Sequence, residues 1–264
     1  MYGPTFPRTI TIDEIHAITR DFVVATRLAR ESGFDAVEIH AGHGYLLSQF
    51  LSPFTNRRSD EYGGVFGNRA RFLLEVIREV LSSCGSSMTV VVKMNLQDGF
   101  SNGGGLDEAM KVATLLETEG VHGLVLSGGF VSKAPMYVMR GSMPVGVMAR
   151  HIKNPWMKVG TWLFGRFLMK PEPFKEGYFL EDALKIRSIV KLPLIFVGGM
   201  TSREGIENVL EQGFEFVQFG RALIHDPAFI NKLKTGEVNI SGCQHTNYCI
   251  ARMYSGKMVC IQQE

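Results

Sequence analysis

The sequence predicts an α/β protein of the TIM or (β/α)8 barrel type in which about five of the eight β/α units are present. The first observation behind this prediction is a helix followed by a short β-branched strand, which recurs about every thirty residues and indicates a parallel sheet. The second is that polar, glycine-containing loops follow nearly every strand. A doubly wound sheet would concentrate such residues at one switch point, so the loops favour a barrel.

The first unit spans residues 11–40. Apolar side chains recur close to every 3.6 residues over 11–32, which predicts a helix. Thr11 and Glu14 have the spacing of a capping box at its start, and Gly33 ends it. The run 34–40 that follows is rich in β-branched and apolar residues and predicts a buried strand.

The same pattern recurs along the rest of the chain. The further expected helices and strands are helix 68–81 with strand 89–94, helix 107–119 with strand 123–126, helix 180–190 with strand 194–197, and helix 202–212 with strand 216–219. The remaining length falls in an insertion at about 130–178 and a tail at about 236–264. We therefore expect residues 1–264 to form a single barrel-like domain, incomplete by about three units.

The composition is that of an ordinary globular protein. Of 264 residues, 45% are hydrophobic and 20% charged, and the net charge is +2, too small to gather nucleic acid or an anionic membrane. Four cysteines are too few for a disulfide framework, and the chain has neither a leader-like start nor a run of about 18 apolar residues. We expect a soluble, cytoplasmic protein with a small-molecule partner, no nucleic-acid partner and no membrane span.

Chemically useful side chains gather at the end of the first strand. Because side chains alternate along a strand, Glu38 and His40 share one face, with His40 at the mouth. His43 and Tyr45 follow on the turn. Two imidazoles and a phenol can bind a carbonyl oxygen and deliver a proton. On spacing alone, hydrogen-bonded loop residues explain the trio equally well.

Lys93 ends the apolar run 89–92, where a cation requires an anion or a polarised carbonyl. A carboxylate of the barrel, such as Glu38, is one candidate partner. Glycine pairs also follow the last two strands. Gly198-Gly199 and Gly220-Arg221 fit the phosphate site that many barrels build from these loops, although tight turns alone would explain the glycines.

The segment 33–80, GFDAVEIHAGHGYLLSQFLSPFTNRRSDEYGGVFGNRARFLLEVIREV, closely resembles the old yellow enzyme family of FMN-dependent oxidoreductases. The resemblance continues through VVVKMN, LSGG, PLIFVGGM and FEFVQFGRALIHDP, and covers most of 11–233 outside the insertion. It implies an FMN-binding TIM barrel with NAD(P)H as reductant. In members of the family, about three further β/α units precede the helix at 11–32.

The resemblance also implies roles for individual residues. His40 and His43 would hydrogen-bond the substrate oxygen above the flavin, and Tyr45 would protonate the substrate carbon opposite hydride delivery. Lys93 would face the N1/O2 edge of the flavin. The residues that would grip the FMN phosphate are Gly198, Gly199, Gly220 and Arg221.

The function expected on this basis is FMN-dependent NAD(P)H oxidoreduction of activated alkenes such as α,β-unsaturated carbonyl (enone-type) compounds. One alternative is a catalytically impaired partial barrel or subunit that binds no flavin alone, with homo-oligomers formed through exposed strand edges. Another is a cofactor-free, aldolase-like or phosphate-binding barrel, for which Lys93 is available as a Schiff-base lysine.

Two segments lie outside this scheme. In the tail, Cys243, Cys249 and Cys260 stand where related two-domain dienoyl reductases carry iron–sulfur cysteines, but Thr246 occupies the place of a second thiolate, so we expect neither a cluster nor another metal site. The aromatic and methionine-rich insertion fits a substrate lid, a satellite core, or an interfacial membrane contact through residues 155–169.

Overall fold

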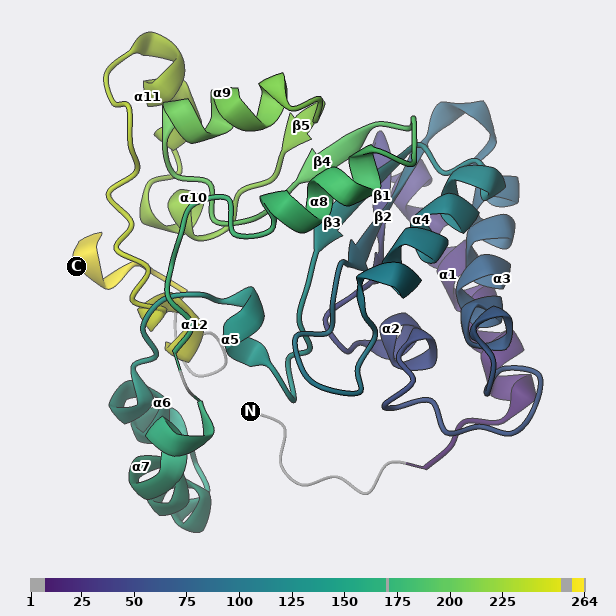
Figure 1. Ribbon diagram of the computed structural model, residues 1–264, viewed down its shortest axis with the longest axis horizontal. Helices are drawn as coiled ribbons and strands as arrows, with labels where there is room; N and C mark the ends of the chain where they lie inside the picture. The colour runs from purple at the N-terminus through teal and green to yellow at the C-terminus, as the bar shows by residue number, and fades with distance from the viewer. Residues whose placement is uncertain (1–7, 170, 253–257, 264) are drawn as a thin grey trace.

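The computed structural model describes residues 8–169, 171–252 and 258–263 (Figure 1). It confirms the prediction of a partial barrel wall. Five parallel strands pair in the order of the chain, β1-β2-β3-β4-β5. The strands are β1 (Ala36–Ala41), β2 (Thr89–Asn95), β3 (Gly123–Ser127), β4 (Leu194–Phe196) and β5 (Phe216–Val217). Within the described residues, β1 and β5 each pair along one edge only.

The long helices that precede each strand lie where the periodicity predicts them, with ends that differ by a few residues. They are α1 (Ile12–Glu31), α3 (Phe66–Cys84), α4 (Leu106–Glu119), α8 (Leu180–Arg187) and α9 (Arg203–Glu211). Further elements lie in the loops and the tail: α2 (Leu46–Leu51), α5 (Pro135–Val138), α6 (Val145–His151), α7 (Pro155–Leu168), α10 (Arg221–His225), α11 (Phe229–Thr235), α12 (Tyr248–Arg252) and the 3₁₀ turns η1 (Gly85–Ser87) and η2 (Ile261–Gln263).

The capping box predicted at the start of α1 is present. The Thr11 hydroxyl accepts from the Glu14 backbone N–H at 3.2 Å, and the Glu14 carboxylate accepts from the Thr11 N–H at 2.8 Å. The chain leaves the helix through Gly33, whose φ of +84° is favourable for glycine. Both ends of the helix are therefore set by local sequence.

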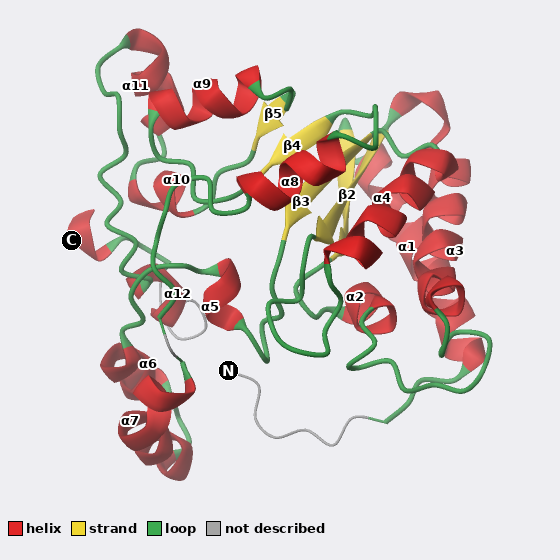
Figure 2. Ribbon diagram, viewed as in Figure 1, coloured by secondary structure: helices red, strands yellow, loops and turns green. Residues whose placement is uncertain are grey.

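The two faces of the sheet differ in burial. One face packs under the helices and is fully covered, as Val92, Leu124 and Leu194 show, each with 0% exposure. Figure 2 shows α1, α3, α4 and α8 beside this part of the sheet. The other face, which would line the interior of a closed barrel, remains partly open, so that Phe216 of β5 is 58% exposed. The predicted site residues of β1 and β2 lie on this open face.

The predicted insertion between β3 and α8 forms a helical projection. Its helices α6 and α7 lie away from the sheet, at the lower left of Figure 1. They pack closely at Gly165, where a Cβ atom would lie 2.5 Å from Val145 Cγ1. Among the helices of the described residues, none combines the length and the apolarity needed to cross a bilayer.

Candidate active site

The structure brings together the three residues predicted at the end of β1. The ring centroid of His40 lies 4.9 Å from that of His43 and 5.1 Å from that of Tyr45. His40 belongs to β1, while His43 and Tyr45 lie on the turn that leads into α2. Tyr45 is 41% exposed, so its phenol is accessible from the open mouth. The cluster can present two imidazoles and a hydroxyl to one small molecule.

His43 is held by the ends of the two neighbouring strands. Its backbone is in the left-handed region, with φ +60°, and its N–H donates to Asn95 Oδ1 at 2.9 Å. Its Nε2 is hydrogen-bonded to Ser127 Oγ at 2.7 Å. Neither Asn95 nor Ser127 has a role among the sequence predictions. The sequence offers one weak indication of their role, which is that each is a polar residue at the end of a mostly apolar strand.

Burial keeps both imidazoles neutral near neutral pH. It lowers the pKa of His43 to about 4, with smaller contributions from His40 and Lys93. Burial is also the main cause that lowers the pKa of His40, followed by the charge of Lys93 and opposed by that of Glu38. A neutral imidazole offers one N–H donor and one acceptor. These rings can therefore hydrogen-bond a substrate oxygen without adding charge to the site.

One atom of the cluster lacks a partner. His40 Nδ1 is buried and makes no hydrogen bond to any part of the chain that the structure describes. Buried polar side-chain atoms are nearly always satisfied, so this exception requires an explanation, and a bound ligand atom would supply one. His40, His43 and Tyr45 are therefore suited to bind the oxygen atom of a substrate, as the resemblance implies.

Lys93 lies next to His40 in the register of β1 and β2. Its Nζ donates to Glu38 Oε1 at 2.6 Å, and Glu38 Oε2 accepts from Gln218 Nε2 at 3.1 Å. The pairing with a barrel carboxylate, one of the two possibilities for Lys93, is thus present. Because Gln218 directly follows β5, this chain of contacts joins the two ends of the sheet across its open face.

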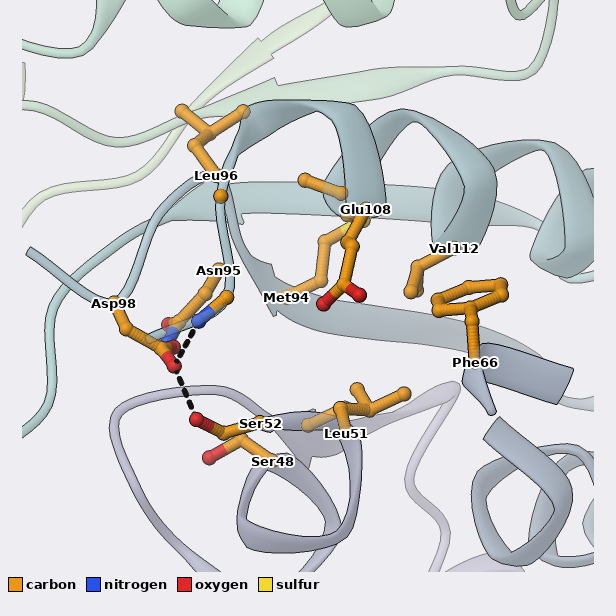
Figure 3. A pocket seen from close by; sticks show the side chains of 14 residues that line it. Ser48, Leu51, Ser52, Phe66, Met94, Asn95, Leu96, Asp98, Glu108 and Val112 are labelled. Carbon is orange, nitrogen blue, oxygen red and sulfur yellow. Dashed lines mark hydrogen bonds between the residues drawn. The ribbon is translucent and has the colours of Figure 1, made fainter. Parts of the chain in front are cut away.

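A buried polar network around Asp98 is linked to the cluster through Asn95; Figure 3 shows its members Asp98, Asn95 and Ser52. Asp98 is 4% exposed and lines a cavity of about 40 Å³. Its carboxylate accepts from Ser52 Oγ at 2.6 Å, from the Gly104 N–H at 2.7 Å and from Asn95 Nδ2 at 2.9 Å. Asn95 in turn accepts from the His43 N–H, so Asp98 acts on the site through Asn95.

An aromatic ring stands among the residues predicted to grip phosphate. A Cβ on Gly199 would lie 2.7 Å from Phe174 Cε2, and the guanidinium carbon of Arg221 lies 5.9 Å from the centroid of the same ring. Arg221 Nη1 donates to the Arg140 carbonyl and to Asn247 Oδ1, both at 2.7 Å. The structure brings Gly199 and Arg221 to one place, but in it Phe174 fills the space between them.

The other two glycines have different surroundings. A Cβ on Gly198 would lie 2.7 Å from Phe196 Cζ, so glycine there permits close packing of the ring. Gly220 is followed directly by the short helix α10, and a Cβ on it would meet nothing within 4 Å. The phosphate side of the predicted site thus fits less well than the side at the mouth of β1.

The Glu176 carboxylate accepts hydrogen bonds from the backbone N–H groups just before α9. Glu176 Oε1 accepts from the N–H groups of Thr201 and Ser202 at 2.5 and 2.7 Å, and Glu176 Oε2 accepts from Ser202 Oγ at 2.7 Å. Donors at this end of a helix favour an anion. In this structure that anion is the side chain of Glu176.

We expect Glu176→Ala to lower the free energy of unfolding by about 2–3 kcal/mol, because three donors lose a charged acceptor. Urea denaturation followed by circular dichroism measures the change. Glu172→Ala is the matched control, since Glu172 is exposed and its loss should cost under about 0.5 kcal/mol. Equal stability of the two variants would contradict the role given to Glu176.

The tail contains three of the free thiols. Burial raises the pKa of Cys249, and Cys260 Sγ lies 3.3 Å from His225 Nδ1. Over residues 8–169, 171–252 and 258–263, no group of three or more His, Cys, Asp or Glu side chains is arranged to hold a metal ion.

The fold places the cluster of His40, His43 and Tyr45 at the carboxyl end of a parallel strand, the end at which TIM-barrel enzymes carry their active sites. Residues 2–160 match the NADH:flavin oxidoreductase / NADH oxidase family. The chain belongs to this family, whose members use FMN with NAD(P)H as the reductant.

Two curated relatives show how much of a family member the chain represents. It is 38% identical over 249 residues to a 4,4'-dithiodibutanoate disulfide reductase of Rhodococcus erythropolis, covering 93% of this chain and 61% of the relative. It is 35% identical over 236 residues to an NADH oxidase of Thermoanaerobacter brockii, covering 89% of this chain and 32% of the relative. The chain thus spans less than two thirds of the length of either protein.

Solved structures share the fold. An amine oxidase acting on 6-hydroxypseudooxynicotine, from Pseudomonas geniculata N1, superposes with a TM-score of 0.75 at 24% identity, covering 97% of this chain and 34% of that one. An old yellow enzyme homologue from Zymomonas mobilis gives a TM-score of 0.62 at 23% identity, covering 90% of this chain and 57% of that one. These likenesses support the assignment of the five strands to part of a TIM barrel.

Proposed function

We propose that this chain forms the catalytic part of an FMN-dependent NAD(P)H oxidoreductase that reduces activated alkenes such as α,β-unsaturated carbonyl compounds. The observation that carries the proposal is the cluster of His40, His43 and Tyr45, in which both imidazoles are neutral and His40 Nδ1 has no partner among the described residues. Membership of the family supports the cofactor.

In this proposal, bound FMN supplies the hydride, as flavins do in general. His40 and His43 donate hydrogen bonds to the carbonyl oxygen and so draw electrons away from the alkene. Ser127 binds His43 Nε2, which leaves Nδ1 of that ring for the substrate. Tyr45 delivers a proton to the α-carbon, and its hydroxyl is well suited to this because it lies at the open mouth.

Lys93 has a supporting role in the proposal. Its cation would favour negative charge on a bound, reduced flavin, and Glu38 keeps the ammonium group in place at 2.6 Å. Gln218 fixes the second oxygen of Glu38. The position of the Lys93 ammonium group therefore depends on Glu38 and Gln218 as well as on Lys93 itself.

The alternative of a partial barrel that binds no flavin alone also has observations in its favour. Phe174 stands between Gly199 and Arg221, and Glu176 takes two backbone N–H groups at the start of α9. One face of the sheet is open as well, with Phe216 of β5 58% exposed. Under this alternative the catalytic cluster is retained without its cofactor.

The visible absorption spectrum of the desalted protein, with and without added FMN, tests the proposal. We expect a flavin band that bleaches with NAD(P)H under nitrogen and returns in air, and steady consumption of 2-cyclohexenone by the loaded protein. A colourless protein that retains no added FMN would refute the proposal for this chain and favour the partial barrel. Flavin that is bound and reduced but never reoxidised by the enone would refute the substrate class.

A further inference from the structure

The outward face of α7 is apolar, and no part of the chain that the structure describes covers it. Its exposed apolar side chains, with their exposed fractions, are Trp156 (85%), Phe167 (83%), Trp162 (68%), Phe164 (60%), Leu163 (55%) and Val159 (53%). The inner face is already used, since Gly165 is buried against Val145 of α6. Exposed aromatic surface of this extent marks an interaction site in a globular protein.

The charges around this face have a single sign. Residues 141–171 contain no Asp or Glu, although the whole chain has 26 acidic residues against 28 basic ones. Arg150, Lys153, Lys158 and Arg166 are all exposed, and none of them forms an ion pair within the part of the chain that the structure describes. The net charge of the whole chain is too small to attract a membrane, but the local charge at α6 and α7 is entirely positive, so the partner of this surface should be anionic.

The apolar and cationic residues form adjacent rows. Residues four apart lie on the same side of a helix, so Lys158, Trp162 and Arg166 make one row along α7. The next residues, Val159, Leu163 and Phe167, make a parallel row beside it. A cationic row along the border of an aromatic face is typical of helices that lie at a membrane surface.

A cavity adjoins the cationic row. It has a volume of about 310 Å³ and lies between α6 and α7, lined by Gly146, Ala149, Arg150, Lys158, Val159 and Trp162. Two cations from different helices thus border one cavity, with an indole beside them. This combination suits a lipid phosphate, whose charge would contact Arg150 and Lys158 while its acyl chains follow the apolar row.

We propose that α6 and α7 dock this protein on anionic phospholipid membranes, with α7 lying along the surface. The helix has 14 residues and is about 21 Å long at 1.5 Å per residue, shorter than the roughly 30 Å apolar core of a bilayer, so it rests in the interface. A second copy of the chain suits this face poorly, because two copies would oppose cation to cation. The proposal is independent of flavin binding.

Tryptophan fluorescence tests the proposal directly, because the only two tryptophans of the chain, Trp156 and Trp162, both lie on α7. The full chain is titrated with vesicles of three quarters phosphatidylcholine and one quarter phosphatidylserine. We expect the emission to shift to the blue, to be quenched by brominated acyl chains, and to revert in high salt. Equal binding to pure phosphatidylcholine vesicles, or no shift with either vesicle, would overturn the proposal.

Charge reversal identifies the residues. Lys158→Glu with Arg166→Glu should weaken vesicle partitioning by at least about tenfold, because each basic side chain near an anionic surface contributes about fivefold. Arg20→Glu with Arg27→Glu changes the net charge equally on exposed positions of α1 and should leave partitioning unchanged. Equal losses in the two double variants would overturn the assignment to α7.

Removal of apolar side chains provides a second test. Leu163→Ser with Phe167→Ser should abolish quenching by brominated lipid, whereas Phe34→Ser should not, although Phe34 is also exposed (64%) and lies far from α7 in the sequence. A blue shift that grows with protein concentration in the absence of vesicles, together with a doubled mass in sedimentation, would show that a second copy covers the face and would overturn the proposal.

Discussion

Tyr45→Phe is expected to lower the rate of enone reduction by about 10²–10⁴-fold, the usual contribution of a positioned general acid. The substitution removes only the hydroxyl, and the ring keeps its place 5.1 Å from His40. Reduction of the flavin by NAD(P)H requires no proton from Tyr45, so its rate should stay the same. Stopped-flow measurement of the two half-reactions separates these effects.

Tyr248→Phe on α12 is the matched control, because it removes a phenolic hydroxyl from a half-buried ring away from the cluster at Tyr45. It should leave both half-reactions unchanged. If Tyr45→Phe slowed both half-reactions equally, the hydroxyl would be needed for the integrity of the site rather than for proton delivery. An unchanged oxidative half-reaction would assign the proton to another group.

The second large effect is expected at Asp98. Asp98→Ala removes the carboxylate that accepts hydrogen bonds from the Gly104 N–H, the Ser52 hydroxyl and the Asn95 side-chain amide. Because these buried donors then lose an acceptor, the free energy of unfolding should fall by about 3–5 kcal/mol. Freed from Asp98, Asn95 holds His43 less firmly, so enone turnover should also fall. Denaturation in urea measures the first effect and steady-state kinetics the second.

Asp107→Ala is the control for Asp98→Ala. Asp107 is exposed in the first turn of α4, where a carboxylate contributes at most about 1 kcal/mol. Asp98→Asn keeps the size of the side chain and one acceptor oxygen, so we expect a loss of stability between those of Asp98→Ala and Asp107→Ala. If Asp98→Ala were as stable as Asp107→Ala, the network around the cavity would not support the site.

Features encoded locally could be predicted from the sequence. The capping box of Thr11 and Glu14, the five strands and their connecting helices all follow from periodicity and end signals over short windows. The alternation along β1 also places Glu38 and His40 on one face. The grouping of His43 and Tyr45 with His40 follows because only a short turn separates them.

Features that depend on long-range packing could not be predicted. Asn95 and Ser127 reach His43 from β2 and β3, across 52 and 84 residues of chain. Phe174 enters the predicted phosphate site from the insertion, whose path no periodicity determines. Likewise, the apolar sequence of α7 fits a helix buried in a satellite core as well as a helix with an exposed apolar face. The sequence does not show how much of this helix α6 covers.

The order of the strands has a consequence for biosynthesis. Each strand from β2 onward pairs with the strand made just before it, so the sheet can grow strand by strand as the chain leaves the ribosome. In the described sheet, every strand pairs with the strand that precedes or follows it in the sequence, so the entropy cost of closing the loops between partners stays moderate. The fifth strand, β5, contributes only Phe216–Val217 and pairs with β4 after the other four strands have been made. Because β5 is the shortest strand and is held by so few ladder hydrogen bonds, the described wall should fray first at β5.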